Sequence, residues 1–169
     1  MFLGSAELEN GGHYFFKCLG GDRYNSWLEG REDDYSVRLN YQDVDIQEKL
    51  NDANLYPGIE WIAYETFEPD VYLFKCMVGD GWLKGDKDGN VILDTQLTGD
   101  PGFNWKVYPI EYEENVYLVR CMAHQSNHWY LKSDEQGNVR TADETVDSSS
   151  YWRSVYNGIT DSSTRWRNR

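Results

Sequence analysis

Short apolar stretches that each end in a cysteine recur three times along the chain. They read HYFFKC at His13–Cys18, VYLFKC at Val71–Cys76 and VYLVRC at Val116–Cys121. Turn residues follow each stretch, and long helical runs are scarce. Apolar runs of about four to eight residues bounded by turn formers predict β-strands. We therefore predict a chain built mainly from short strands.

The landmarks that follow each cysteine recur in the same order. An aromatic-leucine pair comes first, at Trp27-Leu28, Trp82-Leu83 and Tyr130-Leu131. A turn with a following valine comes next, reading GREDDYSV at 30–37, GDKDGNV at 85–91 and SDEQGNV at 133–139. A closing tryptophan comes last, at Trp61, Trp105 and Trp152. This self-similarity predicts three copies of one unit of about 45 residues, at about 12–66, 69–110 and 114–157.

The first copy is longer because it carries an insertion between Tyr41 and Gly58. Val44, Ile46 and Leu50 lie among polar residues there, a spacing that predicts one or two helical turns ended by Pro57-Gly58. Residues 158–169 form a polar tail with too little apolar surface to offset its ordering entropy. We expect much of this tail to be disordered.

The composition fits an all-β domain. Aromatic residues make up 15% of the 169 residues, with seven Trp and thirteen Tyr, and the length suits one domain. Four short strands in each of three copies give twelve strands. A six-stranded barrel capped by three hairpins holds twelve strands, whereas a three-bladed propeller would leave a hole. The predicted fold is therefore all-β, a single β-trefoil domain with twelve strands in three pseudo-threefold repeats.

The order of strand, aromatic-leucine pair, glycine turn and closing tryptophan resembles the repeat of the fascin-like, amaranthin-like and ricin-B-like β-trefoil families. The resemblance covers Gly12 to Tyr156, and it implies the fold more specifically than the function. In the ricin-B pattern a glutamine stands two residues before the closing tryptophan. Ile59, Phe103 and Ser150 occupy those places here, so this is not a typical ricin-B domain. That family's sugar-binding residues cannot be assigned by motif.

Net charge and hydropathy argue against nucleic acid as a partner and against insertion into a membrane. The formal charge of −13 repels phosphate backbones, so nucleic acid is not an expected partner. No segment approaches the roughly 20 apolar residues that cross a bilayer, and we expect no membrane insertion. The first residues lack the basic residue and long apolar run of a secretory signal. We expect a soluble protein that is cytoplasmic, or secreted without a recognisable signal peptide.

Residues capable of catalysis or metal binding are present, but their pattern favours structural roles. Cys18, Cys76 and Cys121 occupy one place in three copies, which favours small buried hydrophobes over a disulfide or a reactive thiol. His124 and His128 are four residues apart and could bind a metal on a helix, but the sequence between them is typical of a loop. The chain has no Gly-x-Ser-x-Gly elbow. We expect no enzyme, metal site or cofactor.

The turn after Gly85 resembles the start of a calcium-binding loop. It reads Asp86-x-Asp88-Gly-Asn90, but no Glu closes it at the twelfth position and the glycine falls too early. A hairpin turn explains the same residues, since Asp-Gly is a strong hairpin signal.

Carbohydrate binding is the function that the residue pattern favours. It needs an aromatic face for the apolar side of a sugar and fixed polar groups for its hydroxyls. Each copy places Trp or Tyr near a turn rich in Asp and Asn, so up to three shallow sites are expected. The candidates are Tyr24, Trp27, Asp33 and Asp34 in the first copy, Trp82, Asp86, Asp88 and Asn90 in the second, and His124, Asn127, Trp129, Tyr130, Asp134 and Asn138 in the third.

Two other classes of function remain open. One is a protein-interaction trefoil of the fascin or protease-inhibitor type, which binds no sugar, although the acidic charge disfavours actin filaments as direct partners. The other is an enzyme or a toxin-associated domain. Lectins and protein-interaction trefoils both use exposed aromatic residues on the same fold, so the sequence alone does not decide between them. The lectin hypothesis names glycans or glycoproteins as partners, and the sequence is compatible with a homo-oligomer.

Overall fold

Six antiparallel strands form a closed ring in the computed structural model, which describes residues 8–20, 26–40, 44–124, 126–142 and 145–161. The ring strands are β1 (Gly12–Cys18), β4 (Trp61–Glu65), β5 (Val71–Cys76), β8 (Trp105–Pro109), β9 (Val116–Cys121) and β12 (Trp152–Thr160). Each pairs with the next along the chain, and β12 pairs back with β1. This pairing closes a barrel without a free edge.

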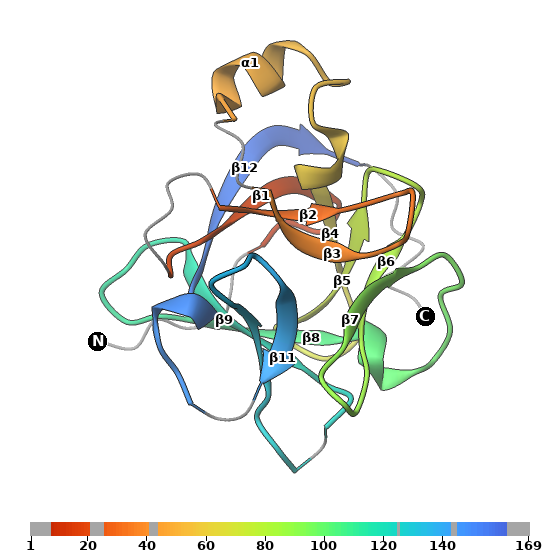
Figure 1. Cartoon of the computed structure of the whole chain (residues 1–169), viewed down its shortest axis with the longest axis vertical. Coiled ribbons are helices and arrows are strands. Elements are labelled where there is room, and N and C mark those ends of the chain that lie inside the picture. Colours follow the sequence, from red (N-terminus) through yellow and green to blue (C-terminus); the bar gives the residue numbers. More distant parts are fainter. Residues whose placement is uncertain (1–7, 21–25, 41–43, 125, 143–144, 162–169) are drawn as a thin grey trace.

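Three hairpins cover one end of the barrel (Figure 1). They are β2 (Trp27–Gly30) with β3 (Val37–Asn40), β6 (Trp82–Gly85) with β7 (Val91–Asp94), and β10 (Tyr130–Ser133) with β11 (Val139–Ala142). Each hairpin accepts one backbone hydrogen bond at its turn from the next hairpin around the axis. The bonds run from Leu93 N to Tyr35 O, from Thr141 N to Gly89 O and from Leu39 N to Gly137 O, at 2.8, 2.9 and 2.9 Å. This cyclic pattern relates the thirds by rotation.

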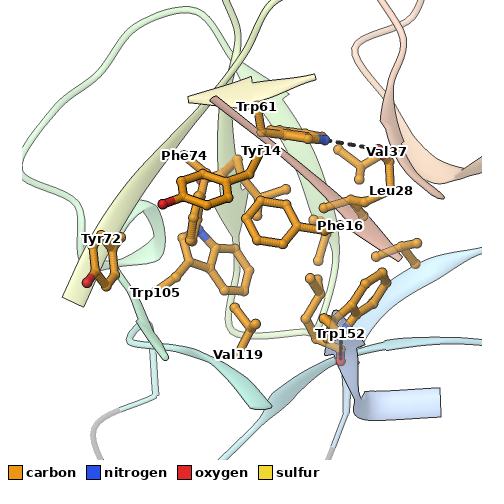
Figure 2. Packing of buried hydrophobic residues seen from close by; sticks show 14 of the residues in the cluster. Tyr14, Phe16, Leu28, Val37, Trp61, Tyr72, Phe74, Trp105, Val119 and Trp152 are labelled. Carbon is orange, nitrogen blue, oxygen red and sulfur yellow. Dashed lines mark hydrogen bonds between the residues drawn. The ribbon is translucent and has the colours of Figure 1, made fainter. Parts of the chain in front are cut away.

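The closing tryptophans form the centre of the core (Figure 2). Trp61, Trp105 and Trp152 are fully buried, and each indole Nε1 donates to the carbonyl of the leucine in its own unit's aromatic-leucine pair. The three cysteines are also buried and free. Burial raises the pKa of the Cys76 thiol to about 12 and that of Cys121 to about 11. The prediction that the cysteines act as small hydrophobes is confirmed.

The twelve strands, the closed barrel and the three equivalent hairpins make this fold a β-trefoil, which confirms the predicted fold class. Some boundaries differ from those predicted. Short 3-10 turns precede the closing strands, at η1 (Pro57–Ile59), η2 (Pro101–Phe103) and η3 (Ser148–Ser150). The strand β12 continues to Thr160 because Gly12 pairs with Thr160, so ordered structure extends past the expected boundary at 157. Residues 162–169 lie outside the described part of the chain.

The predicted helix is present in the insertion but ends earlier than expected. The helix α1 (Ile46–Asn51) lies outside the ring of barrel strands (Figure 1), and Asp45 caps its start by accepting from Gln47 N at 2.9 Å. It ends at Asn51, with Asp52 as its C-cap, and Pro57-Gly58 begins the separate turn η1. No helix in the described residues is long and apolar enough to cross a membrane.

A buried row of charged groups ties the insertion to the barrel. Lys49 on α1 lies 3.0 Å from Glu60 Oε1, and the other Glu60 oxygen lies 2.7 Å from His13 Nδ1. The second ring nitrogen of His13 lies 2.9 Å from Asp161 Oδ1. His13, Lys49 and Glu60 are all buried. The row therefore joins β1, α1 and the end of β12.

Candidate functional site

Two of the predicted stacking residues, Trp27 and Trp82, are core residues. Each is only 4% exposed. Trp27 packs in an apolar cluster with Phe15 and Ile59, and Trp82 packs with Tyr64 and Phe103. Sugar stacking needs a free ring face, which neither indole offers. Their prediction as sugar platforms is wrong because apolar residues from the later 3-10 turns η1 and η2 and from neighbouring strands cover them.

The third unit lacks this apolar cover. Its counterpart of Ile59 and Phe103 is Ser150, whose hydroxyl takes part in the cap of η3. The tyrosine that corresponds to Trp27 and Trp82 is Tyr130, and it remains partly exposed. Its ring meets Tyr108 edge-on at 6.4 Å and His128 edge-on at 6.5 Å between ring centroids. The third unit therefore presents aromatic surface where the others bury it.

The loop between β9 and β10 adds a second aromatic pair. Trp129 stacks on His124 with ring centroids 4.2 Å apart and planes 26° apart. Arg120 is buried, and its guanidinium donates to the His124 carbonyl and to the Tyr108 hydroxyl, at 3.3 Å each. Both aromatic pairs are thus joined through one arginine, which fixes the loop against β8 and β9.

The turn of the second hairpin lies against this loop. A Cβ on Gly89 would lie 3.4 Å from Trp129 Cζ3 and 3.1 Å from Arg140 Nη2, and its φ of +91° favours glycine. Asp86 to Asn90 therefore sits beside third-unit residues. We call Tyr108, Arg120, His124, His128, Trp129 and Tyr130, together with this turn and Arg140, the third-unit site.

The third-unit site therefore draws its residues from two repeats, whereas the candidates were grouped by single repeat. A loop of one unit meets the hairpin turn of the preceding unit, because the three hairpins contact one another around the axis. The second unit shows the same arrangement, since a Cβ on Gly79 would lie 3.4 Å from Glu32 Cβ in the first hairpin turn. That loop is only Gly79-Asp80-Gly81 and carries no aromatic residue. Up to three sites were expected, and of the loops after β5 and β9 only the one after β9 carries aromatic residues against a hairpin turn.

The turn carboxylates are largely used by their own backbone. Asp86 Oδ1 accepts from Asp88 N and Asn90 N at 2.9 Å each, and Asp86 Oδ2 accepts from Asn90 Nδ2 at 3.0 Å. Asp134 and Asn138 repeat this arrangement in the third hairpin. Partial burial raises the pKa of Asp86, but hydrogen bonds from the turn outweigh it, so the net shift is downward. These residues shape the turns, which leaves Asp88 as the freely exposed carboxylate of the site.

The other candidates lie apart from the third-unit site or at its rim. Asp33 and Asp34 are exposed in the first hairpin turn, where Asp34 Oδ1 accepts from Ser36 N at 3.1 Å. Asn127 is exposed on the loop that carries Trp129. Tyr24 lies outside the described residues. The sequence interpretation missed Tyr108, Arg120 and Arg140, although the change to Ser150 was a visible sign that the third unit packs differently.

No family model matches the chain, and no curated protein matches it in sequence. Solved structures do match its fold. SeviL, solved bound to asialo-GM1 saccharide, is 12% identical over 85% of this chain and 96% of its own, with a TM-score of 0.62. The Polyporus squamosus lectin, solved bound to the epitope Neu5Aca2-6Galb1-4GlcNAc, is 15% identical over 88% of this chain and 50% of its own, with a TM-score of 0.65.

A third similar structure is a salivary protein from Culex quiquefasciatus of the Cysteine and Tryptophan-Rich family. It is 15% identical over 90% of this chain and 98% of its own, with a TM-score of 0.64. Identities this low show the fold alone. The protein therefore has a lectin-like β-trefoil fold.

Proposed function

We propose that this protein is a carbohydrate-binding protein, a lectin, that binds glycans at the third-unit site. The observation that carries the proposal is the partly exposed aromatic surface of Trp129 and Tyr130 beside a polar hairpin turn. Two lectins with this fold were solved with saccharides bound, SeviL and the Polyporus squamosus lectin. Their likeness supports the class of ligand, and the partly exposed rings of Trp129 and Tyr130 support the proposed location.

The chemistry of the site suits a sugar ring. An indole or phenol face packs on the C–H face of a pyranose, while nearby polar groups orient its hydroxyls. Asp88 offers acceptors, and Asn127 and His128 offer both donors and acceptors; all three are exposed at the rim. Arg120 holds the aromatic pairs in place, so little conformational entropy is lost on binding. A single shallow site of this kind binds weakly, and multivalency would raise its avidity.

A glycan array with the purified protein tests the proposal, with free-sugar competition as the second readout. The variant Trp129→Ala is expected to lower glycan affinity by about tenfold or more, because truncating an aromatic anchor removes most of its contact area. Phe67→Ala is the matched control, since Phe67 is 69% exposed on the turn between β4 and β5. It should bind like the unmodified protein.

Two results would contradict the proposal. One is a well-folded protein that binds no glycan, and the other is Trp129→Ala binding as tightly as the Phe67 control. If sugar binding is absent and the protein co-sediments with filaments or inhibits a protease at equal stoichiometry, the protein-interaction hypothesis is the better one.

A further inference from the structure

We propose that Asn157 is a site of spontaneous deamidation, a covalent modification that converts its side-chain amide into a carboxylate. The sequence contains two Asn-Gly dipeptides, Asn10-Gly11 and Asn157-Gly158. A glycine after asparagine favours the reaction, because the missing Cβ leaves the backbone nitrogen open to the asparagine side chain. The fold gives the two dipeptides opposite surroundings, so the second one reacts in the native protein and the first one is protected. This modification is independent of glycan binding.

Asn157 and Gly158 lie in a bulge of β12. The pairing of β12 with β1 passes from Tyr156 opposite Tyr14 to Thr160 opposite Gly12, and the longer side of this interval is the one in β12. Extra residues of a bulge are left out of the regular ladder of hydrogen bonds. Gly158 is exposed, and a Cβ built on it would meet no atom within 4 Å. Its backbone therefore has space to rearrange.

The Asn157 side chain is already bent back over the peptide bond that it shares with Gly158. Its Oδ1 accepts a hydrogen bond from Ile159 N at 2.9 Å, which closes an Asx turn across Gly158. A side chain bent in this way brings its amide carbon, Cγ, toward the Gly158 nitrogen. The Ile159 N–H also points at the oxygen on which negative charge develops during attack, as an oxyanion-hole donor does. The local geometry therefore favours attack on Cγ.

The reaction needs only water and a base from the solvent. The base removes the proton from Gly158 N, and this nitrogen forms a bond to Asn157 Cγ. The Cγ–Nδ2 bond then breaks, and Nδ2 leaves as ammonia after taking up a proton from the solvent. Water opens the resulting succinimide ring at either carbonyl, which gives aspartate or the β-linked isoaspartate. Both products carry a carboxylate in place of the neutral amide.

The first dipeptide is protected at both of its reacting groups. Asn10 Oδ1 accepts from Glu65 N at 2.9 Å, so the side chain is directed across to the end of β4. Gly11 N donates to Ala63 O at 2.7 Å, so the nitrogen that would attack is already occupied. Gly11 is also buried, and a Cβ there would clash with Asp161 O. Reaction at Asn10 therefore requires this part of the barrel to open first.

Formation of isoaspartate at Asn157 should weaken the end of β12. Isoaspartate adds a methylene to the backbone inside the bulge and so shifts the residues that follow. Among these is Asp161, whose N donates to Gly11 O at 2.8 Å and whose Oδ1 lies 2.9 Å from His13 Nε2. The isoaspartate form should therefore unfold at a lower denaturant concentration than the unmodified protein.

Ageing of the purified, folded protein tests the proposal. The protein is incubated at mildly alkaline pH, digested and analysed by peptide mass spectrometry, with isoaspartate and aspartate peptides separated by chromatography. Asn157 should deamidate about tenfold faster than Asn10 or more, because reaction at Asn10 first requires the loss of buried hydrogen bonds. Incubation in guanidinium chloride is the matched control, since both dipeptides are then released from the fold and should react at similar rates. Asn157→Gln should remove the modification at this position and leave Asn10 protected.

The result at each dipeptide is decisive. Lack of conversion at Asn157 in the folded protein overturns the proposal, whatever happens in guanidinium chloride. Equal rates at Asn10 and Asn157 in the folded protein overturn the claim that the fold selects between them. An isoaspartate form as stable as the unmodified protein keeps Asn157 as the site but contradicts the weakening of β12.

Discussion

At the scale of single residues, one position in each unit determines whether an aromatic ring is core or surface. Ile59 and Phe103 stand two residues before a closing tryptophan and pack with Trp27 and Trp82. Ser150 stands at the same place in the third unit and is too small to cover Tyr130. The repeat pattern identifies all of these positions from the sequence. It does not show that Ile59 packs on Trp27 or Phe103 on Trp82, because these partners are about 20 to 30 positions apart along the chain.

Trp82→Ala is expected to lower the free energy of unfolding by about 3–5 kcal/mol, the range for removing a buried large aromatic side chain. Equilibrium denaturation in urea measures the loss. Trp129→Ala, at a partly exposed ring, should cost much less stability while removing glycan binding. If the two variants are equally stable, the division of the aromatic residues into core and site is wrong.

His13 is a residue whose charge state depends on its two carboxylate partners. Both ring nitrogens lie within 2.9 Å of a carboxylate oxygen, an arrangement that two N–H donors satisfy. Burial opposes the charged imidazole, but the hydrogen bonds to Glu60 and Asp161 outweigh it and raise the pKa of His13 above 6.5. Burial likewise opposes ionised Glu60, while hydrogen bonds from His13 and Lys49 lower the pKa of Glu60 below 4.5.

Stability should therefore depend on pH through this row of charges. The contribution of His13 is complete below 6.5 and is lost as pH rises through its higher folded-state pKa. The contribution of Glu60 is present above 4.5 and is lost as pH falls through its lower folded-state pKa. The urea midpoint of the unmodified protein should exceed that of His13→Gln most between these values, and the difference should shrink toward pH 9. A difference that stays constant from pH 6 to pH 9 would contradict a charged His13.

At the scale of elements, the end of each first hairpin strand is packed against a cysteine of the following unit. A Cβ on Gly30 would lie 2.7 Å from Cys76 Sγ, and a Cβ on Gly85 would lie 2.6 Å from Cys121 Sγ. Ser133 stands at the third equivalent position, where its hydroxyl lies 3.2 Å from Cys18 Sγ. Two strands thus end in a place with no room for a side chain, and the third has adapted to hold a small one.

Gly85→Ala is expected to destabilise the protein by about 1–3 kcal/mol, because an added methyl group overpacks a filled core. Ser133→Ala is the matched control at the equivalent position, and it should stay within about 1 kcal/mol of the unmodified protein, the worth of one hydrogen bond. Thermal unfolding of both variants measures the contrast. Equal destabilisation would mean that the third strand end is packed as tightly as the other two.

At the scale of the whole molecule, the repeat and its fold could be predicted from three similar segments. The closing tryptophans and the cysteines recur at one place per unit, and the barrel buries them alike. The contact between the loop at Trp129 and the turn at Gly89 could not be predicted in this way. It follows from the rotation that brings neighbouring hairpins together, and this rotation leaves no pattern within a single unit.

The symmetry is broken in the core where the third unit carries a smaller residue. Val119 stands at the place of Phe16 and Phe74, and all three line a small apolar cavity beneath the hairpins with Leu28, Leu83, Leu131, Trp61 and Trp152 (Figure 2). Val119→Leu should fill part of this cavity and stabilise the protein by about 0.5–1 kcal/mol. Val107→Leu, at a buried valine that does not line the cavity, should instead destabilise it by about 1 kcal/mol or more. Denaturant midpoints of both variants check this, and destabilisation by both would show that the cavity is too rigid to accept a methylene.

The seam between β1 and β12 has a consequence for the timing of synthesis. Of the six barrel strands, β1 is synthesised before the other five, and one of its two barrel neighbours, β12, is synthesised after them; the two strands pair from Cys18 opposite Trp152 to Gly12 opposite Thr160. Until then a nascent chain carries two unpaired strand edges, which are sites of mispairing between chains. The native barrel can therefore close only after translation of β12.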